Sequence, residues 1–374
     1  MFRLRTGVVA AVTLAATAGF ATPAFASGPG PGFGGAVFVQ TDSTAGNQIV
    51  AYQRAADGSL TQAATYPTGG LGGVLTGSVV DHLASQGSLQ YDRQRSLLFA
   101  VNAGSDTVSV FSVFGDRLAR RQVLNSGGTF PVSIAVHGDL VYVLNALNGG
   151  SVQGYRLLGD FLVPLSGSNR ALGLDPTETP QFTSTPGQVA FTPDGSQLIV
   201  TTKNNGNDID VFGVGFGGYL TRAPVVNAEP GTVPFGITFD TSGDLVIAEA
   251  GTDALATFSV ARGGTVSAIS ELPSAQAATC WVAPAGQYLF AGNAGSGTET
   301  GYSSAAGQLS LIADTNTDAG TVDASATPDG QFLYVQTGAA GIVDEFGVGA
   351  GGSLTPLGSV TVPGAVGGEG IVAS

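Results

Sequence analysis

Residues 94–124 read QRSLLFAVNAGSDTVSVFSVFGDRLARRQVL. The stretch contains an apolar run, a polar turn, an alternating segment that reaches Phe111, a turn at Gly115 and a second alternating segment. Alternation with a period of two is typical of a half-buried β-strand, and short breaks that contain glycine indicate hairpin turns. These residues therefore predict three consecutive antiparallel strands.

The same order of features recurs along the chain. Most copies open with a further apolar strand and a turn, as in VAFTPDGSQLIV (189–200). The copies occupy residues 35–65, 94–124, 138–165, 196–226, 243–272, 286–313 and 330–360. An aromatic residue is expected to end the third strand, at Tyr52, Phe111, Tyr155, Phe212, Phe258, Tyr302 and Phe346. A glycine marks the following turn at Gly58, Gly115, Gly159, Gly217, Gly263, Gly307 and Gly351. A repeat of about 45 residues built from four strands is one blade of a β-propeller.

Seven such copies predict an all-β fold, a single seven-bladed β-propeller with four-stranded blades over residues 35–374. The first copy has no inner strand before it, and the final residues GEGIVAS (368–374) read as an inner strand with no unit after them. We expect the C-terminal strand to complete blade one and close the ring, because closure removes open sheet edges. An open sandwich of many strands is the alternative, and it does not explain seven copies in register.

Residues 1–26 have the organisation of a secretory signal peptide. Arg3 and Arg5 precede an apolar run, and Ala24 and Ala26 form a small-x-small cleavage site. The run is too short and too rich in Ala and Gly for a membrane anchor. We expect cleavage after Ala26, a Gly/Pro-rich leader at 27–34, no membrane span, and a secreted, extracellular product.

Composition restricts the partners and the sources of stability. The net charge is −14, and an acidic surface repels phosphate, so nucleic acid is not expected as a partner. Only 11% of the residues are charged, while 43% are hydrophobic, which fits a β-rich protein with many tight turns. Cys280 is the only cysteine, so no intramolecular disulfide can form. We expect a monomer without a cofactor.

Two connections between repeats are longer than the others. They run over residues 66–86 and 165–185, and each joins an outer strand to the next inner strand. Both should therefore lie on one face of the ring, together with the turns between strands two and three. Long loops in compact folds are often functional, so we expect a small molecule, a glycan or a protein to bind on this long-loop face.

Polar residues recur at the end of the second strand of the repeats. They include Asn102, Asn145, Lys203, Glu249 and Asn293, and we expect them around one mouth of the channel. Lys203 is the only lysine, and a Lys203–Glu249 pair could orient a carboxylate or lactone or polarise a carbonyl, which makes both residues catalytic candidates. The pair could equally be a surface ion pair. The three asparagines are candidate ligand-binding residues, although Asn also suits such turns structurally.

The remaining polar motifs carry less chemistry. His82 lies in the first long loop and is a candidate ligand-binding residue or general base. His137 reads as a solvated turn residue, and with two histidines no metal site is expected. The stretch NNGNDID (204–210) lacks the glycine and the glutamate of a calcium loop and reads as a turn. Cys280 and Trp281 fall on an inner strand and are interpreted as packing residues.

The segments AVNAGSDTVSVF (100–111), TPDGSQLIVTTKNNGNDIDVF (192–212) and TPDGQFLYV (327–335) resemble the seven-bladed β-propeller lactonase family. That family includes bacterial 6-phosphogluconolactonases and fungal carboxymuconate-lactonising enzymes, and the resemblance covers essentially the whole chain after the leader. It implies a closed propeller. These are strand and turn motifs, so they define the family better than they define an activity.

The resemblance also implies a histidine at the start of an inner strand, with arginine and glutamate nearby. The positions expected for it here are Gly87, Val132, Gly187, Phe235, Thr279, Asp323 and Glu369. None is histidine, so 6-phosphogluconolactonase activity is not expected. The sequence leaves two hypotheses, a secreted binding or interaction module, or an extracellular hydrolase or isomerase acting on a lactone or related carboxylic acid.

Overall fold

The computed structural model describes residues 1–2 and 33–374. The predicted signal peptide therefore lies outside the described residues except for its first two, and the Gly/Pro-rich leader is described only at its end. The first strand begins at Phe33, two residues before the expected start of the propeller.

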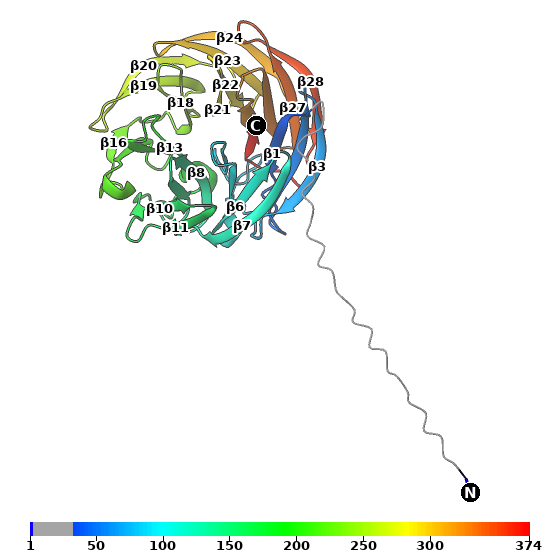
Figure 1. The fold of residues 1–374 in the computed structure, drawn as a ribbon. Helices are drawn as coiled ribbons and strands as arrows, with labels where there is room; N and C mark the ends of the chain where they lie inside the picture. The colour runs from blue at the N-terminus through cyan, green and yellow to red at the C-terminus, as the bar shows by residue number, and fades with distance from the viewer. Residues whose placement is uncertain (3–32) are drawn as a thin grey trace.

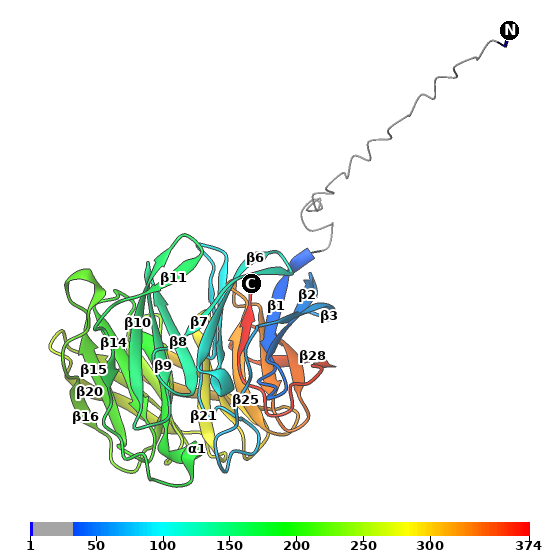
Figure 2. The ribbon, with the colours of Figure 1, turned by 90° about the horizontal axis from the view of Figure 1, so that it is seen from below.

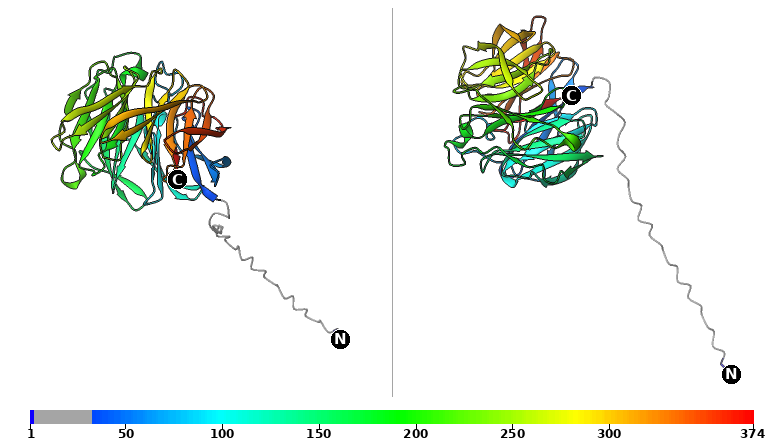
Figure 3. Two further views of the ribbon diagram at one scale, coloured as in Figure 1. Left: turned by 90° about the horizontal axis from the view of Figure 1, so that it is seen from above. Right: turned by 90° about the vertical axis from the view of Figure 1, so that its left-hand side faces the viewer.

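Seven antiparallel sheets surround a common axis and confirm the predicted seven-bladed β-propeller (Figure 1). Figures 2 and 3 show the blades from the side. Blade one contains β29 (Ile371–Ala373), β1 (Phe33–Gln40), β2 (Gln48–Ala55) and β3 (Leu60–Pro67). Blade two contains β4 (Leu89–Asp92), β5 (Leu97–Asn102), β6 (Thr107–Phe114) and β7 (Arg117–Asn125). Blade three contains β8 (Pro131–His137), β9 (Leu140–Asn145), β10 (Ser151–Leu158) and β11 (Phe161–Pro164), with a short β12 (Arg170–Ala171) that also pairs with β10.

The other four blades follow the same order from the axis to the rim. Blade four contains β13 (Pro186–Phe191), β14 (Gln197–Thr202), β15 (Asp208–Gly213) and β16 (Val225–Ala228). Blade five contains β17 (Pro234–Phe239), β18 (Leu245–Glu249), β19 (Ala254–Val260) and β20 (Val266–Pro273). Blade six contains β21 (Thr279–Ala285), β22 (Tyr288–Asn293), β23 (Thr298–Ala305) and β24 (Gln308–Asn316). Blade seven contains β25 (Thr321–Ala326), β26 (Phe332–Thr337), β27 (Ile342–Val348) and β28 (Leu354–Thr361).

The C-terminal strand closes the ring as predicted. β29 pairs antiparallel with β1, with Val39 opposite Ile371 and Val37 opposite Ala373. Beyond the strand, the backbone N–H of Ser374 donates to the carbonyl of Ala36 at 2.8 Å. Figure 1 shows the C-terminus beside β1, so the two ends of the propeller share blade one.

The seven aromatic residues that mark the repeats lie inside the third strands and pack between blades. Each is at most 2% exposed. Burial of such a side chain contributes about 1.5–3 kcal/mol, so each repeat carries its own hydrophobic contact with the ring. A tyrosine in blade seven shows how neighbouring blades are joined, because the Tyr334 hydroxyl donates to the carbonyl of Gly58 in blade one at 2.7 Å.

The inner strands start irregularly, and this changes the alignment of blades six and seven. Their first residue pairs with the end of strand two, and a bulge follows before regular pairing resumes. Thr279 and Thr321 therefore match Pro131, and the residues that match Val132 are Cys280 and Val322. The positions expected for the histidine were therefore wrong by one residue in two blades. Thr279 should have been Cys280, and Asp323 should have been Val322. No histidine stands at the corrected positions.

Both long loops lie on the same face of the ring, as expected. The first is anchored in the core of blades two to four by Leu75 and Leu83, which are both fully buried. The second forms the short helix α1 (Gln181–Ser184), at one end of the ring in Figure 2. The loops touch, because the backbone N–H of Thr76 donates to Oε1 of Gln181 at 3.0 Å. None of the described helices combines the length and apolar character needed to cross a lipid bilayer.

Candidate functional site

The path of the first long loop is fixed by Asp81. Its carboxylate accepts hydrogen bonds from the backbone N–H groups of Leu83, at 2.8 Å, and Ser85, at 2.9 Å. An aspartate that binds nearby backbone in this way stabilises a tight turn. The turn directs the chain from the core residue Leu83 back over the channel, where the N–H of Gln86 donates to the carbonyl of Gly187 at 3.2 Å.

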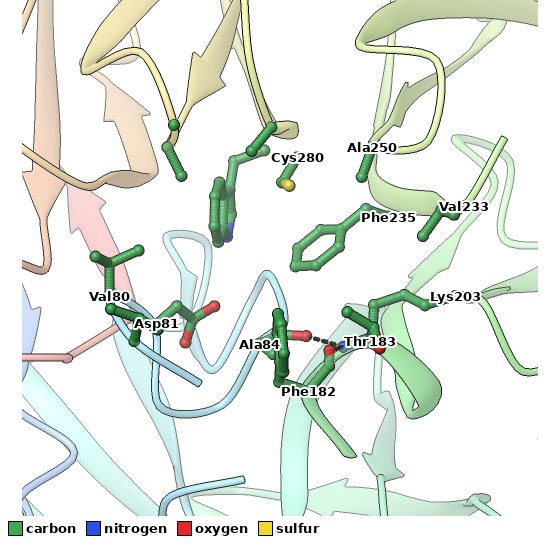
Figure 4. Close-up of a pocket in the computed structure, with 15 residues that line it drawn as sticks. Val80, Asp81, Ala84, Phe182, Thr183, Lys203, Val233, Phe235, Ala250 and Cys280 are labelled. Carbon is green, nitrogen blue, oxygen red and sulfur yellow. Dashed lines mark hydrogen bonds between the residues drawn. The ribbon is translucent and has the colours of Figure 1, made fainter. Parts of the chain in front are cut away.

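A cavity of about 290 Å³ lies beneath the two loops, beside the inner strands of blades four to six. The loops supply one wall and the first residues of β17 and β21 supply the other (Figure 4). Most of the lining is apolar, and Asp81, Thr183, Lys203 and Cys280 supply its polar side-chain atoms. The apolar lining residues are Val79, Val80, Ala84, Phe182, Val233, Phe235, Ala250, Ala278, Trp281, Ala294 and Gly295.

Two aromatic rings form the rigid side of the cavity. Phe235 and Trp281 meet edge to face, with ring centroids 5.0 Å apart and planes at 63°. The indole N–H of Trp281 donates to the carbonyl of Ser85 at 2.7 Å, which ties the inner strand of blade six to the first loop. Both side chains are at most 5% exposed, so their positions are set by packing.

Lys203 reaches the cavity from the end of β14 and is only 1% exposed. Its Nζ donates to the carbonyl oxygens of Ala84, in the first loop, and of Phe182, in the second loop (Figure 4). The bond to Phe182 measures 2.6 Å. Nζ also lies 5.2 Å from the centroid of the Phe235 ring. Lys203 therefore joins both loops to blade four.

Burial controls the electrostatics of the cavity. Desolvation lowers the pKa of Lys203 to about 7, although the charges of Asp81 and Cys280 oppose this shift. Desolvation raises the pKa of Asp81 to about 6, against its backbone hydrogen bonds and the charge of Lys203. Desolvation also raises the pKa of the Cys280 thiol to about 12, so this sulfur stays protonated near neutrality. The cavity therefore holds an acid and a base that both titrate near pH 7.

Further carboxyl groups lie in the channel next to Asp81. Glu369 accepts a hydrogen bond from the N–H of Gly87 at 2.9 Å, and its own N–H donates to Asp42 at 2.8 Å. Burial raises the pKa of Asp42 to about 8 and that of Asp323 to about 7, and it raises the pKa of Glu369 well above its usual range. Within the described part of the chain, no group of three or more His, Cys, Asp or Glu side chains is arranged to hold a metal ion.

The structure separates the two catalytic candidates. Lys203 lines the cavity, whereas Glu249 does not, and among residues 33–374 no hydrogen bond or salt bridge joins them. Glu249 is 2% exposed and accepts a hydrogen bond from the Thr252 hydroxyl at 3.2 Å. Burial, and then the charge of Glu271, raises the pKa of Glu249 to about 7.

The three candidate asparagines are fully buried, and their side chains bond to other protein groups. Asn102 donates to the hydroxyls of Thr107 and Ser109, at 3.1 and 2.9 Å, and accepts from the side-chain amide of Asn47 in blade one at 3.2 Å. Asn293 accepts from Thr279 at 2.6 Å and donates across its own turn. Asn145 donates to the carbonyl of Ser126 at 3.2 Å. None of the three lines the cavity.

His82 is next to Asp81 in the sequence but lies outside the cavity lining. Its ring packs so closely on Gly367 that a Cβ added to that glycine would lie 2.2 Å from Nε2. Burial lowers the pKa of His82. The ring therefore lies against the segment that leads into β29 and away from Lys203.

Sequence reasoning missed Asp81, Phe182, Phe235 and Trp281 as parts of one site. Phe235 was identified only as a position without the expected histidine, and Trp281 as a packing residue. A usable signal was present, because the lone tryptophan, the lone lysine and the two longest loops all belong to the same face. Their convergence depends on how the loops fold across the channel, which no local pattern encodes.

Comparison with known proteins identifies relatives by family and by fold. The family model described as Lactonase, 7-bladed beta-propeller, matches residues 74–367. A search of curated proteins found no match.

Solved structures with the same fold include two described as lactonases. One is the periplasmic gluconolactonase of Pseudomonas aeruginosa, which is 18% identical with a TM-score of 0.71, over 91% of this chain and 98% of that chain. Another is a candidate 6-phosphogluconolactonase of Bacteroides fragilis, also 18% identical, with a TM-score of 0.70 over 91% of this chain and 97% of that chain. At this level of identity the likeness shows the fold.

Proposed function

The chain belongs to the seven-bladed β-propeller lactonase family, and we propose that it is an exported protein that binds a compact, largely apolar organic molecule in the cavity beneath the two loops. The observation that carries the proposal is the cavity itself, about 290 Å³ of mostly apolar space bounded by two loops and two aromatic rings. A dry apolar cavity of about 150 Å³ holds benzene. The present cavity is large enough for a six-membered ring with a short substituent.

The walls favour apolar ligands over sugars. Burial of apolar surface yields about 25 cal/mol for each Å² removed from water. A hydroxyl without a hydrogen-bonding partner in such a site costs about 1–3 kcal/mol. A ligand with one polar group can place it against Asp81 and Lys203, while a polyol would leave several hydroxyls unpaired against Phe182, Phe235 and Trp281.

Trp281 offers a direct test, because it is the only tryptophan in the chain. We expect cyclohexylmethanol to change its fluorescence in a saturable way. Inositol, which has the same six-carbon ring but carries hydroxyls around it, should give no such change. An equal response to the two compounds, or none to either, would refute binding in this cavity.

A cavity-filling variant supplies the matched control. Ala250→Leu places a larger side chain in the lining and should weaken cyclohexylmethanol binding at least tenfold. Ala63→Leu makes the same change at an exposed position on the outer strand β3 and should leave binding as it is. Unchanged binding in Ala250→Leu would place the ligand elsewhere.

Hydrolysis of a small lactone is a second candidate function, favoured by the presence of Asp81 and Lys203 in one cavity. In this reaction the Asp81 carboxylate takes a proton from water while the water oxygen attacks the lactone carbonyl. The Lys203 ammonium stabilises the oxyanion. The ring C–O bond then breaks, and the proton passes from Asp81 to the alkoxide that leaves.

Acid release from δ-valerolactone at constant pH measures this reaction. If the protein is a hydrolase, Lys203→Met and Asp81→Asn should each lower kcat/KM at least tenfold. Glu271→Gln removes an exposed carboxylate outside the cavity and should leave it unchanged. Turnover that survives in both cavity variants would exclude the mechanism.

Export is proposed from the sequence of residues 1–26. The charged start, the apolar run and the Ala-Phe-Ala site support it. Expression in the native host should deliver a chain that begins at Ser27 to the culture medium. A cell-associated chain that keeps Met1 would contradict export.

A further inference from the structure

We infer that Lys203 captures an apolar aldehyde in the cavity as an imine on its Nζ. The inference rests on the proposed binding function and names its ligand class. It assigns to the only lysine of the chain a covalent step that differs from both lactone hydrolysis and passive binding.

The hydrogen bonds of Nζ fit a neutral amine. An ammonium has three hydrogens to donate, and a neutral amine has two hydrogens and a lone pair. Within residues 33–374, Nζ donates to two acceptors, the carbonyl oxygens of Ala84 and Phe182. A neutral amine satisfies both bonds and keeps its lone pair for a carbonyl carbon.

The surroundings of Nζ also favour the reactive form. The apolar walls desolvate the amine and lower its pKa to about 7, while Asp81 and Cys280 act in the opposite direction. A lysine in an apolar pocket is activated as a nucleophile in this way. Near neutral pH a large fraction of Lys203 is therefore able to attack.

Asp81 is placed to move the protons that imine formation requires. The Nζ lone pair adds to the aldehyde carbon, and one amine proton passes to the oxygen, which gives a carbinolamine. The Asp81 carboxyl then protonates the hydroxyl, water leaves as the C=N bond forms, and an iminium remains beside the Asp81 carboxylate. Asp81 and Lys203 line the same cavity, and among the described residues no salt bridge joins them.

Reductive trapping of the full-length protein tests the inference. The protein is incubated with cyclohexanecarbaldehyde and sodium cyanoborohydride, and intact mass and peptide fragmentation then locate the adduct. We expect one reduced alkyl group on Lys203, formed at least tenfold faster than in the urea-unfolded chain. The α-amino group is distinguished from Lys203 by its fragments.

Three variants separate the outcomes. Lys203→Arg keeps donors for Ala84 and Phe182 but cannot form the imine, so its adduct at this position should vanish. Ala63→Leu, at an exposed position on β3, should be trapped on Lys203 at the wild-type rate. Asp81→Asn should slow trapping at least tenfold. Trapping at equal rates in the folded and unfolded chains would overturn the inference, as would an adduct on the α-amino group alone.

The inference and the proposed function can fail separately. If Trp281 reports binding of the alcohol and the aldehyde, yet reduction adds nothing to Lys203, the imine is excluded and the binding function stands. If neither compound changes Trp281 fluorescence and no adduct forms, both fall. An adduct on Lys203 without saturable binding would show that the amine reacts independently of a bound ligand and would also overturn the inference.

Discussion

Individual residues show how a chain with few charges concentrates ionisable groups inside. Lys203 and Asp81 lie in the cavity, and Asp42, Asp323 and Glu369 lie beside it in the channel. Each group pays desolvation, so each is shifted toward its neutral form. The same burial makes Lys203 a candidate nucleophile and keeps the channel carboxyls protonated to a higher pH than usual.

Asp42→Asn tests this at one residue. Asp42 binds a proton up to about pH 8 in the native protein, but only up to about its usual 3.8 when unfolded. The native state therefore holds more protons in this window, and stability declines as pH rises through it. Each unit by which the pKa is raised corresponds to about 1.4 kcal/mol.

Thermal unfolding from pH 5 to pH 9 measures the effect. The Tm of the Asn variant should rise relative to the wild type as pH increases, because Asn cannot ionise. Removal of the Asp42 charge also lets the pKa of Glu369 fall, and this change raises the relative Tm of the variant in the same direction. A difference in Tm that does not change with pH would contradict the raised pKa of Asp42.

At the scale of elements, two loops that are hydrogen-bonded to each other form one wall of the site. Leu75 and Leu83 anchor the first loop, α1 stiffens the second, and Lys203 bonds to both. The strands supply a fixed frame, and the loops supply the lid. Any change in the bonds of Nζ is therefore passed to both loops together.

Lys203→Met should loosen the lid and leave the blades intact. Removal of Nζ leaves the Ala84 and Phe182 carbonyls without this donor, and a hydrogen bond between neutral groups contributes about 0.5–1.5 kcal/mol. Hydrogen exchange should accelerate about tenfold in residues 75–86 and 181–185 and stay unchanged in β13 to β15. Lys203→Arg should restore protection, and equal exchange in the Met and Arg variants would argue against the joining role.

At the scale of the whole molecule, the ring is closed by its shortest inner strand, β29. β29 adds three residues to blade one, yet these residues connect the end of the chain to its first strand. Ile371 is 2% exposed and packs with Val37, Val39 and Val50. Loss of this contact weakens the junction that every other blade depends on.

Ile371→Ala should therefore lower the free energy of unfolding by about 2–4 kcal/mol, the range for a large-to-small change in a core. Val372→Ala changes a half-buried residue on the same strand. It should lower the free energy of unfolding by less than about 1 kcal/mol. Urea unfolding compares the two variants. Equal losses would mean that β29 contributes through backbone pairing alone.

The sequence predicted the ring better than the site. The aromatic residue and the glycine of each repeat are local signals, and the missing inner strand before Gly35 indicated closure. Lys203 was found because it is unique, but its pairing with Glu249 was inferred from adjacent blades without the loops. Asp81, Phe182 and Trp281 meet only through the path of the loops across the channel, and the bulges that displace Cys280 and Val322 depend on strand pairing.

The order in which the blades are made gives closure a consequence for biogenesis. The strand that seals blade one follows the other six blades in the chain, so a nascent chain carries an unsealed ring until all of those blades have been synthesised. For a chain exported as proposed, this delay keeps the polypeptide in a form that can thread through a narrow translocation channel. Under that proposal, β29 pairs with β1 only after translocation.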